Sequence, residues 1–183
     1  MKYAYKSLNQ RADCGSLCPP TETFSTNFVR DAATGLASVP DSEIIEAALK
    51  ILSKRMTRGS LLSSPKAARD YLALRFGHCE HEVYSAIYLD KRHRVLACEE
   101  LFRGTIDGAS VHPRIVVKQA LKHNAASLLI SHNHPSGETS PSQADEMISQ
   151  RLRDALALIE VRLVDHIITS GGNSYSMAEH GLL

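Results

Sequence analysis

Apolar residues recur at helical spacing in two stretches of the first half of the chain. The first predicted helix runs from Asp41, a capping residue, to about Thr57, and Gly59 ends it. Its apolar stripe consists of Ile44, Ile45, Ala48, Leu49 and Leu52. The second helix begins at Ser64-Pro65, because a cap followed by proline is a strong start signal. Its expected buried side consists of Ala68, Tyr71, Leu72 and Phe76.

From Val83 onward, short apolar runs typical of strands alternate with further helical patterns. The predicted strands are residues 83–89, 95–102, 127–131, 161–169 and 175–177. The predicted helices run over residues 113 to about 123 and about 141 to 158. Their expected inward residues are Ile115, Val116, Ala120 and Leu121 in the first, and Ala144, Ile148, Leu152, Ala155 and Leu156 in the second. Interleaved strands and helices predict an α/β layered domain over residues 65–183.

The first 40 residues follow neither period. Turn-forming residues such as Pro19, Pro20 and Gly35 are scattered through them. We therefore predict an N-terminal arm over residues 1–40 that is either extended or partly disordered. A leading helix and linker over residues 41–64 then precede the layered domain.

Composition and charge narrow the range of functions only slightly. Hydrophobic residues make up 43% of the chain and charged residues 22%, which is ordinary for a soluble globular protein. A net charge of +1 and the absence of Trp give no global sign of a nucleic-acid partner. With no secretion signal and no apolar run of transmembrane length in the sequence, we expect a cytoplasmic protein without a membrane partner. The cysteines, at positions 14, 18, 79 and 98, lack paired metal-ligand spacing and are expected to be reduced thiols.

The stretch that carries chemistry lies between residues 131 and 145, where a predicted strand ends and a helix begins. His132 and His134 are two apart, so in extended backbone both imidazoles project to the same side. Asp145 lies about one turn into the next helix, and the intervening loop can fold it back toward the histidines. Two histidines and one carboxylate form a ligand set for catalytic zinc that leaves the fourth position open for water.

Each member of this set also has a plain structural explanation. A lone histidine is usually structural or solvated. Asp145 can be the third residue of a capping box whose N-cap is Ser142. A helix that begins at Ser140-Pro141 instead places Asp145 in the second turn and frees its side chain. Taken together, the two histidines and the aspartate favour one metal site over these separate explanations.

The spacing His132-x-His134-Pro135, followed after seven residues by Ser142-x-x-Asp145, resembles the metal motif of JAMM (MPN-domain) metalloproteins. Residues 132–137, 104–107, 112–114 and 165–168 resemble more specifically the bacterial RadC family. The resemblance covers about residues 43–183. It implies an α+β mixed sheet flanked by helices, layered like a cytidine deaminase, with one Zn²⁺ per chain held by His132, His134 and Asp145.

The same resemblance implies roles for further residues. The general base is a glutamate at the start of a strand, which Glu82 matches best and Glu80 second, with surface exposure as the plain alternative. Ser142 would donate a hydrogen bond to the oxyanion, with helix capping as its structural alternative. Asp165 and His166 can orient a zinc ligand by contacting it without binding the metal themselves. A hydrogen-bonded histidine in the core or at a sheet edge is the more common situation.

Three functions compete on these grounds. The leading interpretation is a zinc-dependent hydrolase of the metallopeptidase or isopeptidase kind, acting on a peptide or protein. The second is a protein of DNA repair or recombination that contacts nucleic acid, although solvated surface charge is the simpler explanation of its candidate residues, Arg92, Arg94, Arg103, Arg114, Lys118 and Lys122. The third is a non-catalytic MPN scaffold, which is least favoured because every ligand position is filled. Residues 1–40 show no pattern of the helix-hairpin-helix-like domain that the resemblance implies for full-length RadC proteins, which weakens the second interpretation.

Overall fold

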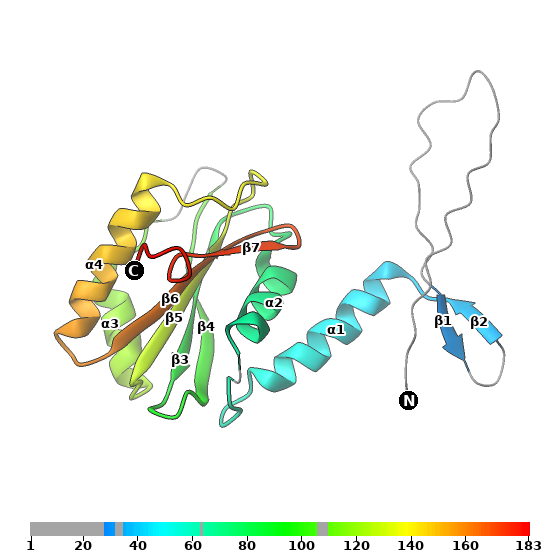
Figure 1. Ribbon diagram of the computed structural model, residues 1–183, viewed down its shortest axis with the longest axis horizontal. Helices are drawn as coiled ribbons and strands as arrows, with labels where there is room; N and C mark the ends of the chain where they lie inside the picture. Colours follow the sequence, from blue (N-terminus) through cyan, green and yellow to red (C-terminus); the bar gives the residue numbers. More distant parts are fainter. Residues whose placement is uncertain (1–27, 32–34, 63, 106–109) are drawn as a thin grey trace, which may run out of the picture. The chain divides into compact units, whose positions relative to one another are not determined.

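The computed structural model describes residues 28–31, 35–62, 64–105 and 110–183 (Figure 1). It divides into two compact units, Met1–Ala48 and Leu49–Leu183. In the first unit, β1 (Phe28–Asp31) pairs with β2 (Gly35–Ser38) in antiparallel fashion. Both strands fall within the predicted arm, whereas most of that arm, together with Cys14 and Cys18, lies outside the described residues. The helix α1 (Asp41–Arg55) contains the division between the units and has no buried residue.

The second unit is built on a five-stranded mixed sheet with the order β4-β3-β5-β6-β7. Its strands are β3 (Val83–Leu89), β4 (Val95–Arg103), β5 (Ser127–Asn133), β6 (Arg162–Ser170) and β7 (Asn173–Ser176). Only β5 and β6 are parallel, and the helix α4 (Gln143–Ala157) connects them. The remaining helices are α2 (Pro65–Phe76) and α3 (Pro113–Lys122). This arrangement confirms the predicted fold class, a mixed sheet flanked by helices.

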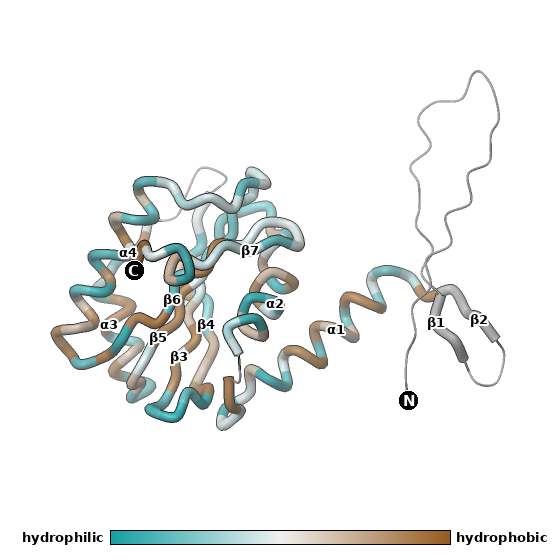
Figure 2. Tube along the Cα trace, in the orientation of Figure 1, coloured by the Kyte–Doolittle hydropathy of each residue, from teal (hydrophilic) through white to brown (hydrophobic). Residues whose placement is uncertain are grey.

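Helices cover both faces of the sheet (Figure 1). On one face α3 and α4 pack over a core that includes Tyr84, Ile130 and Leu152. On the other face α2 packs over a second core that includes Ile87, Leu129 and Ile167. Successive strand residues point to opposite faces, so β3 and β5 contribute to both cores and are buried along their whole length, and Figure 2 shows both hydrophobic and hydrophilic residues along the sheet.

The predicted inward faces of two helices are partly wrong. In α3, Val116 and Ala120 are buried, but Ile115 and Leu121 are exposed. In α4, Ala144 is exposed as well. A helix that covers one face of a sheet buries a narrow stripe, and a residue next to that stripe in sequence is turned about 100° away from it.

The strand β5 extends two residues beyond its predicted end and so includes His132 and Asn133. It pairs with β3 as far as His132, opposite Tyr84, and with β6 as far as Asn133, opposite Thr169. The candidate ligands therefore begin inside the sheet and not in a loop. Among the described residues, no helix is long and apolar enough to cross a membrane.

Candidate metal centre

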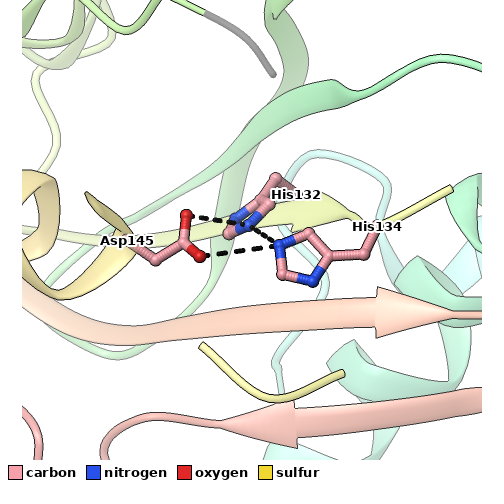
Figure 3. A group of neighbouring side chains, drawn as sticks. All are labelled: His132, His134 and Asp145. Carbon is pink, nitrogen blue, oxygen red and sulfur yellow. Dashed lines mark hydrogen bonds and ion pairs between the residues drawn. The ribbon is translucent and has the colours of Figure 1, made fainter. Parts of the chain in front are cut away.

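The three predicted ligands converge at the carboxyl end of β5 (Figure 3). His132 is the buried penultimate residue of the strand, His134 follows the strand directly, and Asp145 lies in the first turn of α4. The two Nε2 atoms are 2.9 Å apart. The carboxylate oxygens of Asp145 lie 3.2 Å from Nε2 of His132 and 3.5 Å from Nε2 of His134. One atom from each residue can therefore reach a common point.

The loop after β5 fixes the orientation of His134. Gly137 has a φ of +95°, a left-handed conformation that glycine adopts without strain. The turn brings the backbone carbonyl of Glu138 to 2.9 Å from Nδ1 of His134. Because a carbonyl oxygen only accepts, this Nδ1 carries a proton, and neutral His134 presents a lone pair at Nε2. The hydroxyl of Ser170 donates to the carbonyl of His134 at 2.8 Å and holds its backbone.

A buried hydrogen-bonded chain fixes the orientation of His132. Oγ of Ser149 lies 2.5 Å from the backbone carbonyl of Asp145, so the hydroxyl proton points there. Oγ of Ser149 then accepts from Nδ1 of His166, also at 2.5 Å. Neutral His166 in turn accepts at Nε2 from Nδ1 of His132, at 2.8 Å. Both ends of the chain are thus fixed, and His132 also presents a lone pair at Nε2.

When both rings are neutral, these assignments direct two imidazole lone pairs and one carboxylate at the same point, and without a cation there the rings hydrogen-bond to Asp145 through protons instead. Only a positive charge stabilises such a group, and Zn²⁺ prefers nitrogen and oxygen ligands of this kind. Around a tetrahedral zinc the two nitrogens would be roughly 3.3 Å apart, so a small opening of the cluster accommodates the ion. The residues present therefore fit a zinc ion.

The electrostatics of the cluster agree with this demand for positive charge. A hydrogen bond to Asp145 raises the pKa of His134, although partial burial opposes the shift. Burial alone would raise the pKa of Asp145, but hydrogen bonds from His132 and His134 hold it well below its usual range. Burial, followed by the nearby charge of His132, lowers the pKa of His166 well below its usual value, which keeps that ring neutral.

The capping box at the start of α4 is present together with the ligand contacts. Ser142 is the N-cap and accepts from the backbone N–H of Asp145 at 3.2 Å. In return, the carboxylate of Asp145 accepts from the backbone N–H and the hydroxyl of Ser142, at 2.8 and 2.6 Å. The alternative start at Ser140-Pro141 is wrong, and Asp145 nevertheless reaches the histidines. Ser142 itself is exposed beside the cluster.

Glu82 directly precedes β3 and lies next to the cluster. Continuing the β3–β5 register by two residues from Tyr84 and His132 places Glu82 opposite His134. Its negative charge helps to raise the pKa values of both His134 and Tyr84. Glu80 is exposed and lies in a bend two residues before Glu82.

Asp165 and His166, the predicted pair in β6, point to opposite faces of the sheet. His166 contacts His132, as described above. Asp165 points to the other face, where its carboxylate accepts from the hydroxyl of Ser176 at 2.7 Å and the backbone N–H of Ala178 at 3.1 Å. Asp165 thus holds the segment after β7.

Some of the basic residues considered for nucleic-acid contacts are engaged with acidic neighbours. Arg94 pairs with Asp90 at 2.7 Å, and Arg103 pairs with Glu100 at 2.8 Å. Pairs of this kind on the surface partly neutralise the charge that a phosphate would meet.

Two buried residues near the centre were not predicted from the sequence, Asn133 and Ser149. Serine in a helix is usually solvated and so gives little signal. A signal for Ser149 was nevertheless available, because it lies one helical turn after Asp145 and one before Leu152, on the same buried face.

Comparison with known proteins gives the family of this chain. A model described as RadC-like JAB domain matches residues 62–182, so the chain belongs to this family. UPF0758 proteins of Stutzerimonas stutzeri and Ectopseudomonas mendocina are each 49% identical over 171 residues, which cover 93% of this chain and 76% of the relative. The UPF0758 protein of Nitrosococcus oceani is 48% identical over 170 residues. The likeness to the first two relatives therefore extends upstream of residue 62.

Proposed function

We propose that this protein is a zinc-dependent hydrolase that cleaves an amide or isopeptide bond in a peptide or protein, in the cytoplasm. The observation that carries the proposal is the convergence of three lone-pair donors, from His132, His134 and Asp145, whose orientations are fixed by their own hydrogen bonds. A bound Zn²⁺ acts as a Lewis acid, polarising a carbonyl group and lowering the pKa of water.

The surrounding residues supply the proton transfers and the orientation. Glu82 takes a proton from the attacking water and delivers it to the leaving amine. Ser142, exposed at the N-terminus of α4, donates a hydrogen bond to the oxyanion after its hydroxyl turns from the carboxylate of Asp145, to which it donates in the structure. His166 and Ser149 keep Nε2 of His132 deprotonated and directed at the metal position.

The proposal is tested by a cleavage screen of zinc-loaded protein against internally quenched peptides, isopeptide-linked lysine derivatives and DNA. We expect turnover of a peptide or isopeptide substrate. Replacing Glu82 by Gln should retain the fold and the zinc but lower kcat by about 10²–10⁴-fold, because an amide cannot take up the proton.

Glu80→Gln is the matched control and should remain near wild-type activity. Loss of activity in this variant alone would transfer the role of base from Glu82 to Glu80. Full activity in both variants would contradict a glutamate base, and turnover confined to DNA would replace the peptide substrate by nucleic acid.

A further inference from the structure

Asn133, between the two histidines, belongs to the opposite face of the sheet. Successive strand residues alternate in direction, so its side chain points away from the metal position. The residue is fully buried. Its Oδ1 accepts from the backbone N–H of Val83 at 2.7 Å, and its Nδ2 donates to the carbonyls of His81 at 3.0 Å and Cys79 at 3.3 Å. Both amide protons and the carbonyl oxygen of this side chain are therefore used on one short backbone segment.

That backbone segment carries Glu82. The carbonyl of His81 and the N–H of Val83 belong to the peptide groups on either side of Glu82, and Asn133 binds both. On the other edge, the N–H of Glu82 donates to Thr105 at 3.2 Å, and its carbonyl accepts from Gly104 at 2.8 Å. The backbone around Glu82 is thus held from both sides.

The end of the β3–β5 ladder explains why a side chain is needed to bind the backbone N–H of Val83. The β3–β5 ladder ends with the pair Tyr84 and His132. The next pair of that register would be Val83 and Asn133, and there the side chain of Asn133 accepts the N–H of Val83 at 2.7 Å. Without Asn133, the buried N–H of Val83 would lose its partner, which is costly and leaves the strand end free to shift.

Position and direction at this strand end matter because side chains alternate between faces. Glu82 belongs to the same face as Tyr84, whose ring stacks on that of His132 with centroids 5.5 Å apart. A small displacement or twist of the backbone would turn the carboxylate away from the two histidines. Misplacing a reacting group by about 1 Å costs on the order of 10²-fold in rate.

We propose that Asn133 is a positioning residue that holds the Glu82 segment against the metal centre. Its effect on rate rests on the proposed function of Glu82, whereas its effect on the backbone does not. The candidate ligand pair and the positioning residue then occupy three consecutive positions of the chain at the end of β5, with the ligands facing one side and the carboxamide the other.

The test uses the full chain with two substitutions. Asn133→Leu has a similar volume and removes all three hydrogen bonds, and Asn133→Asp retains an acceptor but loses both donors. Zinc content should remain at the wild-type value in both. Amide hydrogen exchange at Val83 should become at least about tenfold faster in Asn133→Leu. Asn124→Asp, at an exposed turn position, is the control and should change neither quantity.

Kinetics on the peptide substrate found in the screen supply the second readout. We expect kcat to fall about 10- to 100-fold in Asn133→Leu with little change in KM. Because Asn133 acts through Glu82, the same substitution in a Glu82→Gln background should cause almost no further loss.

Unchanged exchange at Val83 would overturn the proposal, as would an additive loss in the double variant. Loss of zinc, or unfolding of both Asn133 variants, would also overturn it, because the carboxamide would then support the whole site or sheet. If the zinc-loaded wild type cleaves no substrate, the proposed hydrolase fails, but faster exchange at Val83 with unaltered zinc would still establish the positioning role.

Discussion

The two halves of β5 are equally buried but differ in what their side chains require. In the first half, Leu128 and Ile130 pack against apolar residues of α4 such as Leu156. At the carboxyl end, His132 is just as inaccessible, yet it contacts polar groups, among them His166. Buried apolar side chains need no polar partner. The buried groups at the polar end, in contrast, direct lone pairs at one point, and a cation there would balance them. Burial therefore serves stability in one half and preorganisation in the other.

The helix α4 shows the same division along a single stripe. Its buried residues are Asp145, Ser149, Leu152 and Leu156, which follow one another at spacings of three or four. The first two belong to the polar end and the last two to the apolar half. Substitutions along this stripe and in the loop beside it therefore separate the two requirements.

The largest effect is expected from removing a ligand. His134→Ala leaves two protein ligands, which are too few to retain zinc, so metal analysis after dialysis should show near-complete loss from about one ion per chain. Leu152→Ala is the control, because it removes a buried side chain of the apolar half and should keep its zinc. Full zinc content in His134→Ala would contradict the ligand set.

A smaller effect is expected from the apolar half. Leu152 is fully buried between α4 and the sheet. Replacing it by Ala should lower the free energy of unfolding by about 2–5 kcal/mol, because the removed methyl groups leave a cavity. Chemical denaturation of the metal-free protein measures this. A loss below about 1 kcal/mol would mean that the apolar half does not carry the stability assigned to it.

Removing the hydroxyl of Ser149 should act on the polar end alone. Without it, Nδ1 of His166 loses its acceptor, and the proton order that directs the lone pair of His132 is no longer enforced. We expect zinc affinity to fall about 10- to 100-fold, measured by competition with a chelator. Ser53→Ala, at an exposed position in α1, should leave the affinity unchanged.

The smallest effect is expected from two tyrosines of β3. Tyr84 lies opposite His132 at the polar end of β5, and Tyr88 lies opposite Leu128 in its apolar half. Burial raises the pKa of Tyr84, with Asp145 and Glu82 adding to the shift, and burial followed by Glu99 raises that of Tyr88. A raised pKa means that the folded state favours the neutral phenol. The resulting contribution to the free energy of unfolding is fully present below about pH 10, the pKa of tyrosine in an unfolded chain. It decreases above that pH, as the unfolded chain ionises and the folded one does not. Each tyrosine can contribute at most about 1.4 kcal/mol per pH unit. Chemical denaturation should give a lower free energy of unfolding at pH 11 than at pH 8. This difference should be smaller in Tyr88→Phe.

The fold could be predicted from the sequence to a large extent because its apolar residues follow clear periods. The start of α2 at Ser64-Pro65 and the strand β3 were both predicted at their observed positions. The inward faces of α3 and α4 were harder to predict. A search for apolar residues selects Leu121, which is exposed, and passes over Ser149, which is buried.

The convergence of the three candidate metal ligands could be predicted from their spacing in the sequence, whereas the residues that hold them in place could not. His132, His134 and Asp145 lie close in sequence, so their spacing carries the geometry of the site. The role proposed for Asn133 depends on a backbone segment from a distant strand. The chain from His132 through His166 to Ser149 likewise depends on the parallel pairing of β5 and β6. Tertiary contacts of this kind leave no periodic pattern in one sequence.

The crossover from β5 through α4 has a consequence for the order in which the protein is made. All three ligands lie between positions 132 and 145, on one strand–helix unit, while Glu82 and His166 come from either side of it. Contacts between neighbours in sequence form before contacts between distant ones. During synthesis the unit is complete before β6 has emerged. With the proposed ligand set, we therefore expect all three ligands to be available to a zinc ion before β6, which carries His166, joins the sheet.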